Sequence, residues 1–327
     1  MSTAPPGKLP AVASLVAAML SFGVIPIFLR YFAGADLDAW TVNGVRYSVG
    51  ALFWLPFLLL LERQPGRETA AATGRGVWRD ALVPSVVNVV GQAGFGLSPY
   101  YVSASTIGFV LRLSFLFTIV FGFAVLAEER LLARRPRFWS GAAVSLGGVV
   151  VMFIDKLRGG SPDSVAGLMI LFATALAWGG YSVSVRHYMA CYPARQSFGA
   201  ISLYTSAALV LLMLWRGHVG VLASIGAGLW INLMVSALIG VAFGHVLYYR
   251  GIHRLGPVVA SGIMLVTPFV TYLFAAIFLG ERLSAVEWGG GLLVVVGGGL
   301  LVAARGEIEA GAAHEPPDLD DQGGGRS

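Results

Sequence analysis

The sequence predicts an all-α integral membrane protein in which ten transmembrane helices form two inverted repeats of five. Three observations lead to this fold class. Of the 327 residues, 57% are hydrophobic and only 12% are charged, which lies outside the range of soluble globular domains. Hydrophobic stretches of about 17 to 25 residues, the length that crosses a bilayer core, recur along almost the whole chain. Finally, passages of the first half recur in the second.

Each hydrophobic stretch predicts one transmembrane helix. Glycines and a proline at 94–101 separate the third stretch from the fourth, and Gly256 with Pro257 separates the eighth from the ninth. The ten expected helices are Ala11–Tyr31, Trp40–Leu61, Val77–Leu97, Ser103–Ala127, Phe138–Ile154, Ser164–Val185, Gln196–Trp215, Gly226–Tyr249, Gly256–Gly280 and Ala285–Ala304.

Two pairs of passages indicate an internal duplication. Residues 117–148 and 270–298 each contain a helix that ends in acid-Arg-Leu, followed by a Trp with a Gly two residues later. In "SFGVIPIFLR", ending at Arg30, and "AWGGYSVSVR", ending at Arg186, an arginine follows an aromatic-Gly start by seven residues. Because five is an odd number, the second copy must enter the membrane upside down. The predicted repeats cover residues 11–155 and 163–304.

The basic residues of the loops predict the orientation. About 15 Lys and Arg fall on the side of the two termini and about 5 on the opposite side, which places both termini in the cytoplasm. Residues 1–10 are the expected cytoplasmic N-terminus of a plasma (inner) membrane protein. The polar, glycine-rich segment 305–327 is expected to be a disordered cytoplasmic tail.

The paired acid-Arg-Leu passages, the aromatic-Gly starts and "TPFVTYLFAAIFLGERL" from Thr267 together resemble the EamA family of the drug/metabolite transporter (DMT) superfamily, over roughly residues 11 to 304. This resemblance implies a ten-helix bundle that moves small metabolites, often outward, by alternating access. It does not fix the solute. The halves differ at one point, because the first carries Arg112 where the second has an apolar residue near Ile263 or Met264.

Arg112 lies near the middle of the fourth expected helix. An arginine there costs roughly 2.5 to 3.5 kcal/mol on insertion scales, so it should face the protein interior. Either it binds a carboxylate or phosphate of the substrate, or it is a structural arginine bonded to backbone carbonyls at 94–101 or to Asn88 and Gln92. Arg46 lies closer to a helix end, and we expect it to reach the interface in a structural role.

Other polar and aromatic residues of the spans are candidates for the lining of a cavity. Asn88 and Gln92 share a helix face, and they either line a cavity or form interhelical hydrogen bonds. His245 either carries a proton or bonds a neighbouring helix. Aromatic rings would hold the rest of the solute. The full set of candidate substrate-binding residues is Phe22, Asn88, Gln92, Arg112, Trp178, Tyr181, Tyr204, His245, Tyr248 and Phe269.

These features favour a secondary transporter of a small organic metabolite, amino-acid-like or an organic anion, that acts as an exporter. The chain has no GxxxxGKS loop, no HExxH motif and no paired aspartates in its spans, and we expect no catalytic residue, cofactor or metal. The expected partners are the solute and the lipid bilayer, without nucleic acid, and the protein is expected to be a monomer. The alternatives are a membrane-embedded enzyme and a channel or scaffold without carrier activity.

Overall fold

The computed structural model describes residues 8–62, 76–102, 107, 110–158, 164–279 and 284–314. Helices joined by turns make up this part of the chain, and it contains no strand. The helices are α1 (Lys8–Gly34), α2 (Ala39–Glu62), α3 (Val77–Leu97), α5 (Leu113–Val125), α6 (Pro136–Arg158), α7 (Val165–Met189), α8 (Ala194–Arg216), α9 (Ala227–Ser236), α10 (His245–Leu255), α11 (Pro257–Ile263), α12 (Thr267–Leu279) and α13 (Ala285–His314).

Short irregular helices complete these elements. A π-helix, η6 (Ala237–Gly244), joins α9 to α10, so the eighth predicted span is one helical run. A 3₁₀ turn, η7 (Met264–Val266), joins α11 to α12 within the ninth. The remaining 3₁₀ segments are η2 (Ser98–Tyr100), η3 (Ala127–Glu129), η4 (Leu132–Arg134) and η5 (Val219–Ala223).

Every predicted span overlaps a helix of the structure, although the start of the fourth, at Ser103, lies outside the described residues. Five described helices are long and apolar enough to cross a membrane. Two shorter apolar helices accompany them, Leu113–Val125 and Pro257–Thr271. The five long helices are Leu9–Gly34, Val165–Met189, Ala194–Arg216, Ala227–Leu255 and Trp288–Ile308.

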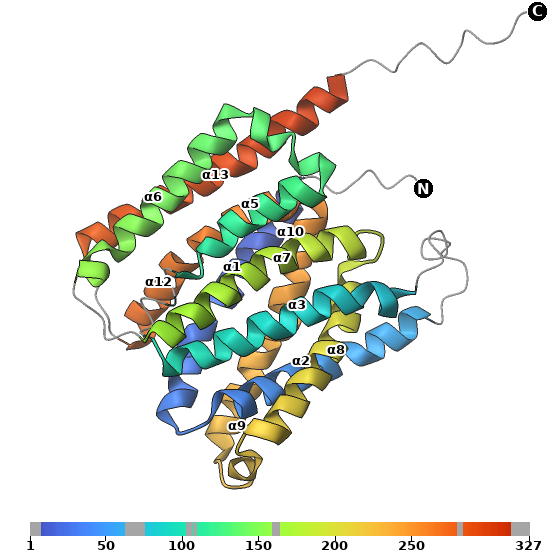
Figure 1. Cartoon of the computed structure of the whole chain (residues 1–327), viewed down its shortest axis with the longest axis vertical. Coiled ribbons are helices and arrows are strands. Elements are labelled where there is room, and N and C mark those ends of the chain that lie inside the picture. Colours follow the sequence, from blue (N-terminus) through green and yellow to red (C-terminus); the bar gives the residue numbers. More distant parts are fainter. Residues whose placement is uncertain are drawn as a thin grey trace, which may run out of the picture.

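Helices α6 and α13, the last helices of the two repeats, lie side by side at one end of the molecule (Figure 1). Gly141 packs against Gly297, whereas Gly148 packs against Gly290. Because one residue number rises while the other falls, the two helices run antiparallel. The absence of side chains at these positions lets the backbones approach closely.

The second helices of the two repeats, α2 and α8, pack in the same antiparallel manner. Gly44 contacts Met213 near one end of the pair, and Leu58 contacts Gly199 near the other. Contacts between the other helices also occur in equivalent pairs. Helix α3 packs on α7 as α10 packs on α1, and α5 packs on α7 as α12 packs on α1. The duplication and the inversion of the second copy are therefore confirmed.

Both repeats break their fourth helix at corresponding points. In the first half a turn at Leu111 and Arg112 precedes α5, and in the second half η7 interrupts the run from α11 to α12. The break at 94–101, predicted from its glycines and proline, is also present, because α3 ends at Leu97 and η2 follows.

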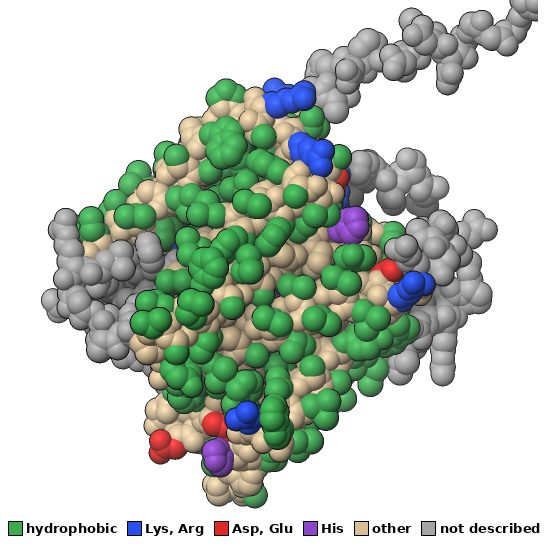
Figure 2. Space-filling view, in the orientation of Figure 1, with side chains coloured by type: hydrophobic (Ala, Val, Ile, Leu, Met, Phe, Trp, Pro, Cys, Tyr) green, Lys and Arg blue, Asp and Glu red, His purple; other side chains and the backbone are tan. Residues whose placement is uncertain are grey.

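Large hydrophobic side chains cover much of the outer surface. Figure 2 shows them across the visible face, with the charged side chains toward its margins. A soluble monomer rarely exposes such an extended apolar area, so this surface fits contact with lipid. Strongly exposed examples are Leu52, Val86, Leu211, Leu214, Trp215, Ile231 and Val296.

The prediction of a disordered tail from Arg305 is wrong for residues 305–314. Helix α13 continues to His314, while residues 315–327 lie outside the described part. The segment "RGEIEAGAAH" is rich in alanine and glutamate, which favour helix. Ion pairs also hold it, because Glu307 pairs with Arg137, and Arg305 lies 3.9 Å from Glu129.

The contact of α6 with α13 predicts that alanine substitutions at two adjacent glycines change the stability of the protein differently. A Cβ atom at Gly148 would lie 2.6 Å from the carbonyl oxygen of Gly290, whereas a Cβ atom at Gly147 would meet nothing within 4 Å. Gly148→Ala should therefore destabilise the protein by about 1 to 3 kcal/mol through overpacking. Gly147→Ala should be neutral or slightly stabilising, because alanine favours helix. Thermal unfolding of both purified variants in detergent measures the difference, and equal midpoints would contradict the packing described above.

Candidate functional site

Buried polar side chains gather where the two halves meet. We call five of them the Tyr–His cluster: Tyr47 of α2, Tyr181 of α7, and His245, Tyr248 and Tyr249 of α10. All are buried except Tyr248, which is partly buried. Such groups are costly inside a membrane protein unless they find hydrogen-bond partners, so their partners define what this region can do.

The hydroxyl groups of the cluster connect α7, α10 and α11. Tyr181 and Tyr249 are hydrogen-bonded through their hydroxyls. The Tyr248 hydroxyl lies 2.9 Å from Oγ of Ser182 and 3.1 Å from Oγ of Ser261. Each hydroxyl can donate or accept, so this network could rearrange to bind a solute without leaving a group unsatisfied.

His245 follows the π-helix η6, and its Nδ1 atom lies 3.1 Å from the carbonyl oxygens of both Gly240 and Val241. Carbonyl oxygens only accept, so Nδ1 carries the proton. The sequence allowed a bond to a neighbouring helix, but the ring bonds its own helix instead. Rings from other helices surround it, with Phe198 at 5.2 Å and Phe22 at 5.1 Å between centroids.

Asn88 and Gln92 share a face of α3, as predicted. The amide of Asn88 donates to the hydroxyls of Tyr47, at 3.3 Å, and Thr205, at 3.1 Å, which joins α3 to α2 and α8. Gln92 Nε2 donates to Asn88 Oδ1 at 3.5 Å, and the backbone carbonyl of Gln92 accepts from Asn43 Nδ2 at 3.0 Å. Of the two alternatives left open by the sequence, these contacts favour interhelical hydrogen bonds.

Arg112 joins the two helix breaks. Its Nη1 atom donates to the carbonyl oxygen of Met264 at 3.0 Å, which is in the 3₁₀ turn of the other half. This contact is the backbone bonding that the structural alternative requires, although the carbonyl is not at 94–101. Ser261 of α11 is hydrogen-bonded to Tyr248 of α10 and lies about one helical turn before Met264. Arg112 therefore lies near this part of the Tyr–His cluster.

The structure brings Phe22, Tyr181, His245 and Tyr248 together, with Asn88 attached through Tyr47. Gln92 joins them through Asn88. Three aromatic candidates do not, and their rings pack in separate pairs. These pairs are Trp178–Phe95, Tyr204–Trp78 and Phe269–Trp288, with centroids 5.0, 5.9 and 5.4 Å apart.

The sequence analysis missed Tyr47 and Tyr249, and it placed Arg46 wrongly. Arg46 was expected to reach the interface, but only 5% of it is exposed. A signal existed, because Asn43, Arg46, Tyr47 and Gly50 recur at helical spacing and all are buried. The position of Arg46 near a helix end was misleading, because neighbouring helices cover that end of α2.

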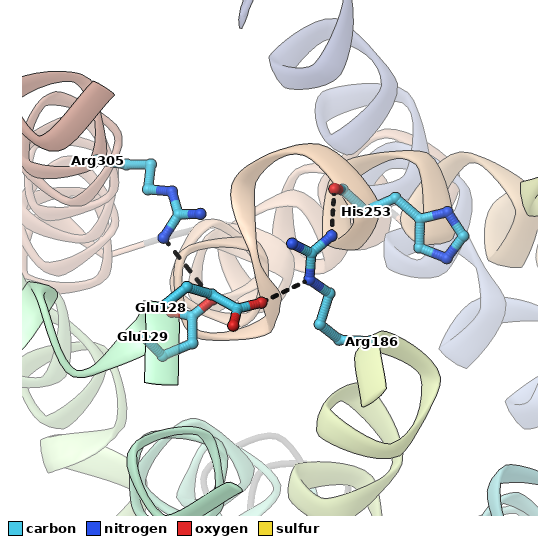
Figure 3. Close-up of polar contacts among 5 residues, drawn as sticks. All are labelled: Glu128, Glu129, Arg186, His253 and Arg305. Atoms are coloured by element: carbon cyan, nitrogen blue, oxygen red, sulfur yellow. Dashed lines mark hydrogen bonds and ion pairs between the residues drawn. The ribbon is translucent and has the colours of Figure 1, made fainter. Parts of the chain in front are cut away.

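A second group of polar residues forms a charged network near the last turns of α7 and α10 (Figure 3). Arg186 of α7 donates through Nε to Glu128, at 3.1 Å, and through Nη1 to the carbonyl of His253. Arg305 of α13 approaches Glu129, whose carboxylate packs against Gly256. Gly256 has a φ of +81°, and a Cβ atom there would overlap the carboxylate, so only glycine fits.

The two glutamates of the network have opposite pKa shifts. Burial raises the pKa of Glu129 to about 7, and Arg305 only partly offsets it; neither carboxylate oxygen has a hydrogen-bond partner among the described residues. Burial also acts on Glu128, but a backbone hydrogen bond and Arg186 outweigh it and lower the pKa of Glu128. The network therefore holds one well-paired and one poorly paired carboxylate.

The raised pKa of Glu129 predicts how its replacement affects stability. Between pH 4.5 and 7 the folded protein keeps a proton on Glu129 that the unfolded chain releases, so stability falls as pH rises through this range. The shift corresponds to about 3 kcal/mol at pH 8. Glu129→Gln should therefore raise the thermal midpoint at pH 8 and change it little at pH 4.5.

Glu128→Gln is the matched control, because its carboxylate pairs with Arg186 and has a lowered pKa. It should lower the midpoint at pH 8. Thermal unfolding in detergent at pH 4.5 and 8 measures both, and a lower midpoint for Glu129→Gln at pH 8 would show that its charge is stabilising after all.

Comparison with known proteins agrees with this architecture. The model of the EamA-like transporter family matches twice, at residues 9–154 and 165–303. An uncharacterized protein of Pseudomonas aeruginosa is 28% identical over 89% of this chain and 96% of its own length. An uncharacterized transporter of Clostridium kluyveri is 24% identical over 76% of this chain and 78% of its own.

The fold also matches a solved protein, a crystal structure with a TM-score of 0.72 and 19% identity that covers 91% of this chain and 99% of the other. This likeness concerns the fold alone. The family model covers both repeats, and the relatives described as transporters span much of the chain. The chain therefore belongs to the EamA-like transporter family and is a multi-pass integral membrane transporter.

Proposed function

We propose that the protein is a secondary transporter that carries a small organic metabolite by alternating access, with its solute bound at the Tyr–His cluster. The observation that carries this proposal is the place of the cluster. Phe22 and Tyr47 from the first repeat meet His245 from the second, with centroids 5.1 and 6.3 Å apart. A site built from both halves is the one that rocking of one half against the other would open alternately to each side.

The chemistry of the cluster fits a small amphipathic solute. Hydroxyl groups of Tyr181, Tyr248 and Tyr249 offer donors and acceptors, while the rings of Phe22 and Phe198 offer apolar surface. Binding sites for small molecules combine such apolar walls with a few polar groups. An amino-acid-like solute or an organic anion has both kinds of group, and export is the direction that the family resemblance implies.

The charged network supplies a gate in this proposal. Glu128 and Glu129 follow α5 of the first repeat, Arg186 is on α7 of the second repeat, and Arg305 is on α13, whose first part belongs to the second repeat. Their ion pairs therefore link the two halves (Figure 3). Opening of the bundle at this network would separate these pairs. Pro26 inside α1, Pro268 at the start of α12 and the turn η7 are where the helices would bend.

Removal of single hydroxyl groups tests the site. Tyr181→Phe or Tyr249→Phe removes one of two paired hydroxyls that would hydrogen-bond the solute, and the loss of one such bond, worth about 1 kcal/mol, should raise KM about fivefold. Tyr204→Phe makes the same chemical change outside the cluster and should leave KM unchanged. The measurement is uptake of amino acids and organic acids into proteoliposomes loaded with the same unlabelled solute.

The same assay separates a carrier from the alternatives. Saturable uptake that a gradient of unlabelled solute accelerates is expected of a carrier. Steady single-channel current across a planar bilayer would instead indicate a channel. Equal KM changes for Tyr181→Phe and Tyr204→Phe would remove the Tyr–His cluster as the binding site.

A further inference from the structure

We propose that Arg46 is the anion-binding group of this transporter and that it binds the carboxylate of a small organic acid or amino acid. The inference rests on the proposed carrier function and names its substrate class. It places the anion-binding group at Arg46, whereas the sequence analysis offered Arg112 either as an anion receptor or as a structural arginine.

Arg46 is a buried cation to which the described part of the chain offers no counterion. Only 5% of the residue is exposed, and its buried Nε atom has no hydrogen-bond partner among the described residues. Among the residues that the structure describes, no carboxylate lies within ion-pair distance of it. The described buried acids have other neighbours, since Asp80 accepts from Tyr192 and Glu129 lies next to Arg305.

A buried cation of this kind raises the free energy of the folded membrane protein. An unpaired buried charge costs several kcal/mol, and a charge inside a membrane span normally faces a partner, water or a pathway. Arg46 lies seven residues along α2 from Ala39, about 10 Å at 1.5 Å per residue. Its low exposure shows that the guanidinium does not reach the surface. A ligand that brings a negative charge would remove this cost.

The guanidinium lies beside the Tyr–His cluster. A Cβ atom at Gly240 would come within 3.3 Å of Arg46 Nη2, which places the guanidinium against the π-helix η6. The carbonyl of Gly240 accepts from Nδ1 of His245, and Tyr47 is the next residue along α2. An anion on Arg46 would thus be next to the hydroxyls and rings that would hold the remainder of the solute.

The planar shape of the Arg46 guanidinium suits a carboxylate. A planar guanidinium can donate two parallel hydrogen bonds to a carboxylate, which gives both affinity and orientation. Arg112 is engaged differently, because its Nη1 atom donates to the Met264 carbonyl across the two helix breaks. That contact suits a structural role, whereas the buried Nε of Arg46 has no comparable bond.

The test compares each acid with its own amide, because the two differ mainly in charge. Lactate with lactamide, and L-phenylalanine with L-phenylalaninamide, are measured by counterflow in proteoliposomes and by thermal stabilisation of the purified protein. The lactate pair represents simple acids and the phenylalanine pair amino acids. Wild-type protein should prefer at least one acid over its amide by tenfold or more.

Arg46→Gln should abolish this preference, and Arg46→Lys should reduce it several-fold, because lysine keeps the charge but loses the planar fork. Arg112→Gln is the matched control and should retain the preference. Without solute, Arg46→Gln should unfold at the same temperature as wild type or higher, since it removes an unpaired buried charge. A structural arginine would give a lower midpoint.

The outcomes separate the two proposals. If wild-type protein transports the amides as well as the acids, or Arg46→Gln keeps the acid preference, the Arg46 site is refuted while the carrier stands. If only Arg112→Gln loses the preference for the acid over its amide, Arg112 and not Arg46 binds the anion. If neither pair binds, the carboxylate assignment fails, and if no solute of a broader panel is exchanged, the carrier proposal fails as well. Should Arg46→Gln not fold, Arg46→Lys and the acid–amide comparison on wild type decide.

Discussion

The absence of water inside the bilayer is the constraint on which the rest of this structure depends. Every buried polar group must find its partner within the protein, so polar side chains collect where helices of the two halves face each other. Asn88 does this for three helices at once, through Tyr47 and Thr205. The same constraint makes Arg46 informative, because a guanidinium there also needs partners and its Nε atom finds no hydrogen-bond partner among the described residues.

The inverted repeat explains why the helix breaks coincide. A break in one fourth helix frees backbone groups, and the pseudo-symmetry brings the break of the other half opposite to it. The bond from Arg112 to the Met264 carbonyl uses this coincidence, since the arginine stands in one break and the carbonyl in the other. The repeats differ at this position because the first half supplies a side-chain donor, Arg112, for a backbone carbonyl of the second half.

The fold was largely predictable because its signals are local. Hydrophobic length gave the helical segments, and the recurring acid-Arg-Leu and aromatic-Gly passages gave the duplication. The site was less predictable, because it depends on which helices meet. Tyr181 and Tyr248 were found as polar residues in apolar spans, but Trp178, Tyr204 and Phe269 pack elsewhere. The place of Arg46 was predicted wrongly because burial by neighbouring helices, rather than position along the sequence, decides it. The extension of α13 was missed because its ion pairs join residues that are far apart in the sequence.

In the proposed alternating-access cycle, the contacts at each end of the bundle decide which conformation is preferred. The charged network supplies such contacts. Its Glu128 is stabilised by Arg186, whereas desolvation of Glu129 outweighs the attraction of Arg305, as the direction of its pKa shift shows. The closed end thus contains one contact that favours closure and one ionised group that opposes it. Closure held by such opposing contributions is weaker than closure by a fully paired network, and the proposed alternating-access cycle, in which this end opens, requires that weakness.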